Sequence, residues 1–120
     1  MEIRIDGTDA MAHGETRTFD FPRNGRTGQG FMIKHQGSYY AYLNQCCHWP
    51  VQLDMGDNDF YYAPADRIMC KTHGAVYQPD TGICDFGPCV RAVLEAYPLK
   101  ALADHVIITV PDAPPATALP

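Results

Sequence analysis

The stretch Cys70-Lys71-Thr72-His73-Gly74-Ala75-Val76-Tyr77 places a thiol and an imidazole in one short segment, with two residues between them. A second such pair, Cys46-Cys47-His48, lies earlier in the chain and has one residue between thiol and imidazole. Each pair follows a strand-like run, so each is expected in a loop whose two side chains can reach the same metal site. Two loops of this kind supply the two sulfur and two nitrogen ligands of a four-ligand site.

The order of these ligands favours a two-metal centre over a single zinc ion. A zinc finger commonly pairs its ligands as Cys-x-x-Cys followed by His-x-x-x-His, whereas each loop here carries one cysteine and one histidine. Mixed pairs suit two irons bridged by sulfide, with both cysteines on one iron and both histidines on the other. A structural zinc-binding module remains the remote alternative.

The residues around both loops resemble the Rieske [2Fe–2S] domain family, as a small ferredoxin-type member. The resemblance covers roughly residues 30–110, and it rests on the two ligand pairs together with a Gly-Pro pair further along the chain. Besides the first ligand pair, the positions that carry it are the strand Ser38 to Asn44, the second loop Cys70 to Tyr77, Pro79, Gly82 and Gly87-Pro88.

This resemblance implies an all-β fold, a Rieske-type antiparallel β-sandwich with a small inserted cluster-binding subdomain at about residues 44–90. The implied cofactor is a [2Fe–2S] cluster, and no catalytic residue is expected. The four implied ligands of the cofactor and its metals are Cys46 and Cys70 for the inner iron, and His48 and His73 for the outer iron.

The resemblance also bears on the reduction potential. Rieske centres lie at roughly −150 to +300 mV, above plant-type ferredoxins. High-potential respiratory members have an extra cysteine in each ligand loop and a serine hydroxyl near the cluster sulfurs, but the corresponding residues here are Val51, Thr72 and Ala75. Tyr77 keeps the second hydroxyl position, where a hydrogen bond to sulfur would stabilise the reduced cluster. We therefore expect a low-to-middle potential.

The implied function is one-electron transfer and not catalysis. We expect a soluble ferredoxin that accepts electrons from a reductase and delivers them to an oxygenase or a similar acceptor. The alternative is a small Rieske accessory subunit of a larger oxidoreductase of the nitrite reductase type. A Rieske oxygenase needs a further domain for its mononuclear iron, held by two histidines and a carboxylate, and 120 residues leave no room for one.

Composition supports a turn-rich β domain and limits the partners. Ten glycines and ten prolines among 120 residues disfavour long helices, and the length suits one domain, expected over residues 1–110. A net charge of −5 argues against nucleic acid and anionic membrane surfaces as partners. No aliphatic run is long enough to span a membrane, and no signal peptide is visible, so we expect a cytoplasmic protein.

The pattern of apolar residues predicts short strands. Gly30–His35 and Ser38–Leu43, joined at Gln36-Gly37, are typical of a hairpin because glycine permits a tight turn. The other expected elements are strands at residues 67–69, 75–78, 97–99 and 105–110 and a helical turn at residues 91–96.

Two segments fall outside this pattern. Residues 54–66 contain four aspartates and are expected to form a solvated acidic loop, because their spacing does not match a calcium-binding loop. Residues 111–120 are rich in proline and alanine, and they are expected to form a disordered tail.

Three cysteines and three histidines remain after the implied ligands are assigned. The remaining cysteines, each expected to be a buried thiol, are Cys47, Cys84 and Cys89. A bridge between Cys84 and Cys89 would instead stiffen the loop between them. The remaining histidines, which have no carboxylate at metal-ligand spacing and are expected in surface or structural roles, are His13, His35 and His105.

Overall fold

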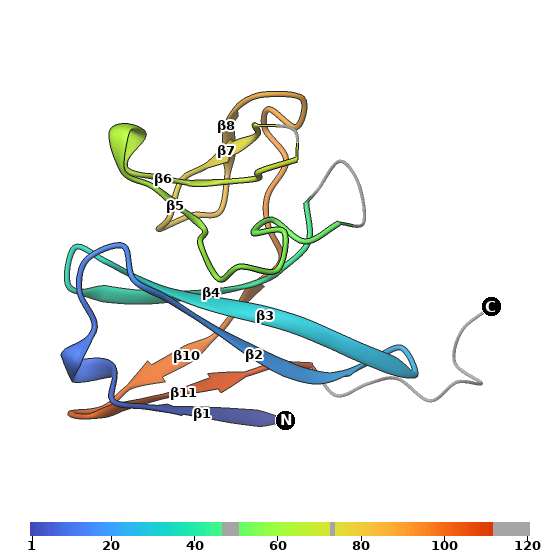
Figure 1. The fold of residues 1–120 in the computed structure, drawn as a ribbon. Helices are drawn as coiled ribbons and strands as arrows, with labels where there is room; N and C mark the ends of the chain where they lie inside the picture. The colour runs from blue at the N-terminus through green and yellow to red at the C-terminus, as the bar shows by residue number, and fades with distance from the viewer. Residues whose placement is uncertain (47–50, 73, 112–120) are drawn as a thin grey trace.

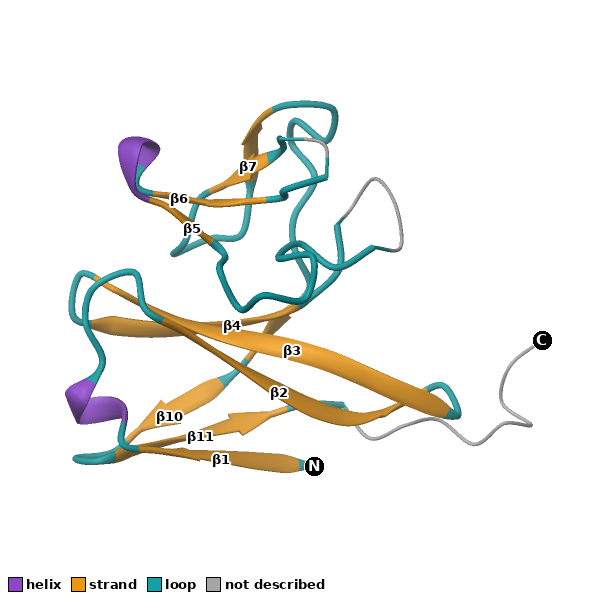
Figure 2. Cartoon of the chain, in the orientation of Figure 1, coloured by secondary structure: helices purple, strands orange, loops and turns teal. Residues whose placement is uncertain are grey.

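The computed structural model describes residues 1–46, 51–72 and 74–111. Within them the protein is built from strands, with two short 3-10 helices, as Figure 2 shows. The elements are β1 (Glu2–Asp6), η1 (Thr8–Ala10), β2 (Thr16–Arg23), β3 (Arg26–His35), β4 (Ser38–Leu43), β5 (Tyr61–Tyr62), η2 (Ala63–Ala65), β6 (Arg67–Met69), β7 (Val76–Tyr77), β8 (Cys84–Phe86), β9 (Ala96–Tyr97), β10 (Leu99–Ala101) and β11 (His105–Thr109). The expected all-β fold is confirmed.

These strands form three antiparallel sheets, ordered β1-β11-β10, β2-β3-β4-β9 and β5-β6-β7-β8. The first two sheets face each other as a sandwich, and the third lies on the outer face of the second (Figure 1). Alternation along β11 explains the inner packing, since Val106 and Ile108 are fully buried while their neighbours are more exposed. Burying such side chains stabilises the fold by about 1.5–3 kcal/mol each.

The central strand β3 is buried on both faces. Met32 belongs to the core of the sandwich, whereas Phe31 and Ile33 belong to the core beneath the third sheet. Phe31 stacks on Phe60 of the segment that leads into β5, with ring centroids 4.1 Å apart. A run of four consecutive buried residues in β3 therefore reflects its place between two apolar cores.

The third sheet is formed by an excursion of the chain between two neighbouring strands. The chain leaves the second sheet after β4 and returns in β9, which pairs with β4 through Ala41 opposite Tyr97 and Tyr42 opposite Ala96. Both cysteine-containing loops and all of β5 to β8 lie within this excursion. The sandwich thus fixes both ends of the segment that presents the candidate ligands.

Several predicted elements are confirmed. The hairpin of β3 and β4 turns at Gln36 and Gly37, whose φ angles of 50° and 81° are those of a type I′ turn. The strand at residues 67–69 is β6, and most of the strand at residues 105–110 is β11. Residues 97–99 are divided between β9 and β10, which belong to different sheets.

The predicted helical turn at residues 91–96 is wrong. Val93 forms a bridge with Ile83, and the Leu94 N–H donates to the Gly82 carbonyl oxygen at 2.9 Å. These hydrogen bonds to a distant segment take the place of helical ones, so packing against the chain before β8 decides the conformation. The predicted tail lies almost wholly outside the described residues. In the described part of the chain, no helix has the length and apolar character needed to cross a membrane.

Candidate metal centre

The two candidate cysteine ligands lie in the apolar core beneath the third sheet. Cys46 follows β4 and is 1% exposed, and Cys70 follows β6 and is fully buried. The Cys46 N–H donates to the Val51 carbonyl oxygen at 2.9 Å, and the Cys70 N–H donates to that of Ala75 at 2.8 Å. Each loop is therefore closed on itself at its cysteine, which fixes the backbone that carries the sulfur.

A backbone hydrogen bond joins the two loops. The Lys71 N–H donates to the Leu53 carbonyl oxygen at 2.9 Å, so the residue after Cys70 is held to the segment that leaves the first loop. Both cysteines belong to one cluster of buried side chains. His48 and His73 lie outside the described residues, as does Cys47.

Tyr77 lies against the sulfur of Cys46. Its hydroxyl oxygen is 3.6 Å from Cys46 Sγ, and its side chain is fully buried. If Cys46 is a thiolate, the sulfur can only accept, so the phenol donates to it. The residue expected to offer a hydroxyl to a cluster sulfur is therefore placed to do so. Ala75, fully buried in the same core, has no hydroxyl to offer.

The Gly87-Pro88 loop packs directly on the second cysteine loop. A Cβ atom on Gly87 would lie 2.8 Å from the Ala75 Cα atom, and Gly87 has a φ of +103°. Only glycine satisfies both the close approach and this backbone angle. The loop between β8 and β9 thus covers the residues that follow Cys70.

This chemistry fits a [2Fe–2S] cluster. Two thiols, each 1% exposed or less, open into one apolar core, and a hydroxyl group approaches one of the sulfurs. Such clusters are held by thiolates, and hydrogen bonds to sulfur tune their reduction potential.

A sequence model of the Rieske [2Fe–2S] domain matches residues 5–102, most of the chain. The chain belongs to the Rieske [2Fe–2S] domain family. The predicted family and cofactor are therefore confirmed, because a [2Fe–2S] cluster is the cofactor of this family. None of the curated proteins matches the sequence.

Solved structures show the same fold. The ferredoxin of carbazole 1,9a-dioxygenase from Nocardioides aromaticivorans IC177 is 24% identical, with a TM-score of 0.66, and the match covers 95% of this Rieske chain and 98% of the ferredoxin. A chain in a complex of reduced oxygenase and oxidized ferredoxin in carbazole 1,9a-dioxygenase is 21% identical, with a TM-score of 0.67 and coverages of 89% and 91%. A chain in a fluorene-bound oxygenase and ferredoxin complex is 18% identical, with a TM-score of 0.69, and this chain spans 31% of it.

The prediction of a solvated acidic loop at residues 54–66 is only partly correct, because residues 55–59 are exposed and lie in a loop, but the first aspartate is buried. Asp54 is only 1% exposed, and its carboxylate accepts hydrogen bonds from the Gly56 N–H at 3.1 Å and the Asn58 N–H at 2.9 Å. It also accepts from the Asn44 side chain at 3.1 Å. Strand β5 and helix η2 follow within the same segment. Buried hydrogen bonds, which composition does not reveal, organise this segment into fixed structure.

Lys71 connects this segment to the second ligand loop. Its ammonium group contacts the carboxylate of Asp57 and lies 3.3 Å from that of Asp59. The hydrogen bond from Lys71 holds the pKa of Asp57 below its usual value, and the same bond raises the pKa of Lys71. Both groups are therefore charged at neutral pH.

His13 and His35, which have no carboxylate at metal-ligand spacing in the sequence, both meet one in the fold. Both rings approach Asp66, with His13 Nε2 3.0 Å from Oδ1 and His35 Nε2 3.1 Å from Oδ2, and Tyr61 also donates to this carboxylate. These hydrogen bonds, with that from Tyr61 the strongest, hold the pKa of Asp66 well below its usual value. The group joins the sandwich to the third sheet. His105 likewise pairs with a carboxylate, that of Asp104, at 2.7 Å.

These histidines and Asp66 are close enough to suggest a metal ion, but the tautomer of His13 argues against one. The Gln36 N–H donates to His13 Nδ1 at 3.0 Å, so a neutral His13 carries its proton on Nε2, the nitrogen that faces Asp66. A metal-bound imidazole needs the opposite arrangement, with a lone pair toward the metal and a proton on the other nitrogen. We therefore assign this group to hydrogen bonding between the two parts of the fold.

Cys84 and Cys89 are both buried, as expected, at 1% and 7% exposure. They flank the Gly87-Pro88 loop, and the Cys84 Sγ atom lies 3.3 Å from the Phe86 carbonyl oxygen. A bridge between the two sulfurs stays the alternative to two buried thiols. Their burial places them in the same apolar core as Cys46 and Cys70.

Proposed function

We propose that this chain is a ferredoxin that carries single electrons to an oxygenase. The observation that supports this most strongly is the pair of buried cysteines with the Tyr77 hydroxyl at one sulfur. A [2Fe–2S] cluster supplies one-electron chemistry when bound. The protein keeps water away from the thiolates and offers a hydrogen bond that favours the reduced state.

The ligand assignment is part of this proposal. Cys46 and Cys70 hold the inner iron, since both sulfurs open into the core. His48 and His73 hold the outer iron, because each follows a ligand cysteine by two or three positions in the sequence. Two neutral imidazoles in place of thiolates make the cluster less negative, which raises its potential above that of an all-cysteine cluster.

The proposed acceptor is an oxygenase and the proposed donor is a reductase. Two of the structural relatives are chains from complexes of an oxygenase with a ferredoxin. The match to the Nocardioides ferredoxin covers 98% of that ferredoxin. Apolar side chains flank the Gly87-Pro88 loop, with Phe86 68% exposed and Val90 54% exposed. An exposed apolar patch beside the cofactor is suited to a partner that binds briefly.

Metal analysis and spectroscopy test the first part of the proposal. The purified protein should contain iron and acid-labile sulfide in equal amounts, and reduction should produce the EPR signal of a [2Fe–2S] cluster. Cys46→Ser and Cys70→Ser should abolish cluster binding, and His48→Ala and His73→Ala should abolish the Rieske signal. His105→Gln, which changes a histidine that pairs with Asp104 and lies in β11, is the matched control. A single zinc ion without sulfide would contradict the assignment.

Electron delivery tests the second part. The reduced protein, mixed with an oxidised Rieske oxygenase in a stopped-flow instrument, should be reoxidised within seconds. Addition of a reductase and NADH should then sustain product formation. Reoxidation no faster than that caused by oxygen alone, with a series of such oxygenases, would contradict the proposed partner class and leave the cluster assignment standing.

A further inference from the structure

Lys71 is the only lysine or arginine in either ligand loop. Neither Cys46 to Leu53 nor Cys70 to Tyr77 contains another. Its side chain is only 24% exposed, although it ends in a charged group. If Lys71 extended into solvent, water and salt would screen its positive charge. The position of its ammonium group therefore decides how strong the electrostatic effect of that charge is at the second ligand loop.

Two carboxylates determine that position. Asp57 contacts the ammonium group, and Asp59 lies 3.3 Å from it. One positive and two negative charges meet beside the loop, so their sum is −1. The Asp57 carboxylate also accepts the Asp59 N–H at 2.9 Å, which fixes the two acidic residues relative to each other.

The segment that carries the two carboxylates is itself anchored on two sides. Asp54, which is buried, receives hydrogen bonds from Asn44 just before the first ligand loop and from the Asn58 N–H. On the other side, the Thr16 hydroxyl of β2 donates to the Asn58 carbonyl oxygen at 2.9 Å. The segment that carries the carboxylates is therefore already ordered. Formation of the ion pair with Lys71 costs this segment little further conformational entropy.

We propose that Asp57 and Asp59 clamp Lys71 against the second ligand loop and thereby lower the reduction potential of the cluster. A positive charge near the cluster favours the added electron, and a negative charge opposes it. Without the two aspartates, Lys71 would extend into solvent, where water and salt screen its charge. With the clamp, the net effect of the three groups opposes electron uptake. The proposal rests on the proposed role of Cys70 as a ligand, but not on the identity of any partner.

The competing explanation is that three surface charges act on the cluster independently. Exposed ion pairs are weak and strongly screened, and Asp57 and Asp59 are 53% and 66% exposed. The two explanations differ in whether the effect of mutating Lys71 is coupled to the effect of mutating the two aspartates. Independent charges give additive effects, whereas a clamp makes the effect of removing Lys71 depend on whether the aspartates are present.

A double-mutant cycle on the cluster-loaded protein tests the clamp by voltammetry at low salt. Asp57→Asn with Asp59→Asn should raise the equilibrium constant for electron uptake about fivefold, and Lys71→Met should lower it about threefold. In the protein lacking both aspartates, Lys71→Met should change it by less than about 1.5-fold, because the lysine then extends into solvent. Lys71→Arg should leave it unchanged.

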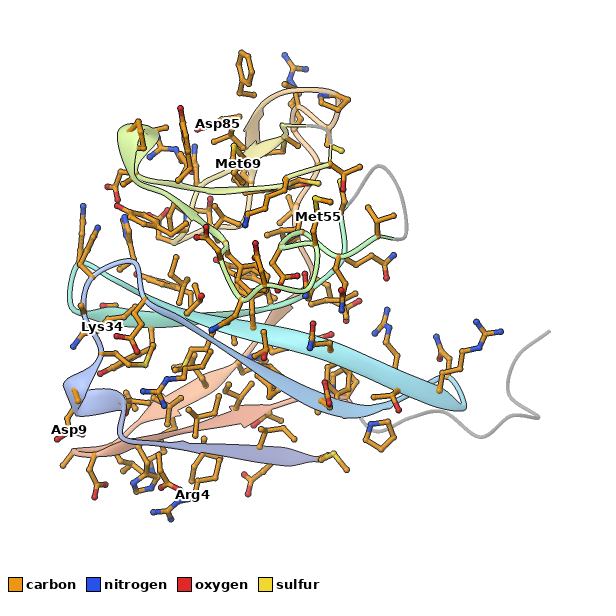
Figure 3. All side chains as sticks on the ribbon, in the orientation of Figure 1. Arg4, Asp9, Lys34, Met55, Met69 and Asp85 are labelled. Carbon is orange, nitrogen blue, oxygen red and sulfur yellow. The ribbon has the colours of Figure 1, made fainter. Side chains whose placement is uncertain are left out.

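Asp6→Asn with Asp9→Asn is the charge-matched control. These residues lie in β1 and η1, on the far side of the sandwich from the third sheet, as the labelled Asp9 and Arg4 show in Figure 3. This variant also removes two negative charges and should change the equilibrium constant by less than about 1.5-fold. Additive effects in the cycle, or an equal shift in this control, would overturn the clamp.

Hydrogen exchange of the same proteins gives a second readout that does not depend on electron transfer. Loss of both aspartates should speed exchange of the Lys71 N–H, which donates to Leu53, and of the Gly74 N–H, which donates to Cys70 at 2.8 Å. Unchanged exchange at both amides would contradict a clamp on this loop. If the variants show the expected shifts in reduction potential but the protein fails to reduce any oxygenase, only the proposed partner is refuted.

Discussion

The Tyr77 side chain places its hydroxyl group close to a proposed ligand atom. Its hydroxyl lies 3.6 Å from Cys46 Sγ in a site that excludes water. Reduction places negative charge on the cluster and its sulfurs, so a hydrogen bond to sulfur is stronger in the reduced state than in the oxidised state. The phenol of Tyr77 therefore favours electron uptake. The strength of its hydrogen bond to sulfur can be measured as a shift in the reduction potential of the cluster.

Tyr77→Phe should lower the reduction potential. The change removes one hydrogen bond and keeps the aromatic ring, so a net loss of about 1 kcal/mol corresponds to roughly 40 mV for one electron. Protein-film voltammetry measures the shift. Tyr42→Phe is the control, because the Tyr42 hydroxyl donates to the Pro79 carbonyl oxygen and not to a sulfur. A potential unchanged by Tyr77→Phe would show that this hydroxyl does not act on the cluster.

A second prediction at the level of single residues concerns Tyr61 and the stability of the protein at high pH. Partial burial and the Asp66 carboxylate raise the pKa of Tyr61 to about 12, whereas a tyrosine in the unfolded chain ionises near pH 10. Between these values the unfolded chain loses the proton and the folded chain keeps it. The contribution of Tyr61 to stability is thus complete below about pH 10 and is lost as the pH rises toward 12.

Tyr61→Phe should therefore flatten the fall in unfolding free energy between pH 9 and 12, as measured by urea denaturation. Other buried tyrosines should also make both proteins less stable as the pH rises. The quantity to compare is therefore the slope of unfolding free energy against pH in the variant and in the wild type. Tyr62→Phe, on the exposed neighbouring position, should keep the wild-type slope. An identical slope in Tyr61→Phe and wild type would contradict the assigned hydrogen bond to Asp66.

At the scale of elements, the Gly87-Pro88 loop and the second ligand loop are packed backbone against backbone. Gly87→Ala would bring a Cβ atom to 2.8 Å from Ala75 Cα at a φ of +103°. The strained angle and the overlap together should cost about 2–4 kcal/mol. The measurement is the midpoint of chemical denaturation, together with the rate at which iron is released to a chelator.

Gly37→Ala separates the cost of the strained backbone angle from the cost of the steric overlap. Gly37 also has a positive φ, +81°, but a Cβ atom there would have no neighbour within 4 Å. This control should cost only about 1 kcal/mol and should leave iron release unchanged. If Gly87→Ala and Gly37→Ala behaved alike, the close packing of the two loops would have no energetic importance.

The elements differ in how well the sequence predicts them. The hairpin of β3 and β4 was predictable because its signal is local, an alternating run on each side of Gln36-Gly37. The alternation of Phe19 and Phe21 with polar neighbours signals β2 equally well, although the prediction omitted that strand. The mistaken helical turn at residues 91–96 failed because its hydrogen-bond partners lie about ten residues away, near β8.

The candidate site shows the same division. Two cysteines and a tyrosine were predictable because the ligand pattern is short and specific, and the structure brings Cys46 next to Tyr77. The contacts of Lys71 with Asp57 and of His13 with Asp66 were not predictable, since they join residues 14 and 53 positions apart. Such contacts depend on packing between elements and leave no local pattern in the sequence.

At the scale of the whole molecule, a net charge of −5 affects how the protein meets its partners. Association with a partner that presents a basic surface is accelerated by long-range attraction, which salt screens. Raising the ionic strength from about 0.05 to 0.5 M should slow electron transfer to such an oxygenase by about tenfold, as measured by stopped flow.

Phe86→Ser distinguishes attraction from contact. Phe86 is 68% exposed and uncharged, so its loss should weaken the complex without changing the salt dependence of the rate or the reduction potential. A rate that does not respond to salt would show that the overall charge has no part in partner encounter. A potential changed by Phe86→Ser would show that the loop, and not the contact, had been altered.

The pairing of β4 with β9 makes the metal-binding region separable from its support. Because the chain departs and returns on adjacent strands, residues 44–94 amount to a very long hairpin loop, and a two-residue turn between Leu43 and Glu95 could replace them without changing the register of Ala41 with Tyr97. The sandwich core beneath would lose none of its inward-facing side chains from β1 and β11. Such an architecture allows redox properties to evolve, or to be transplanted between hosts, while the scaffold is conserved.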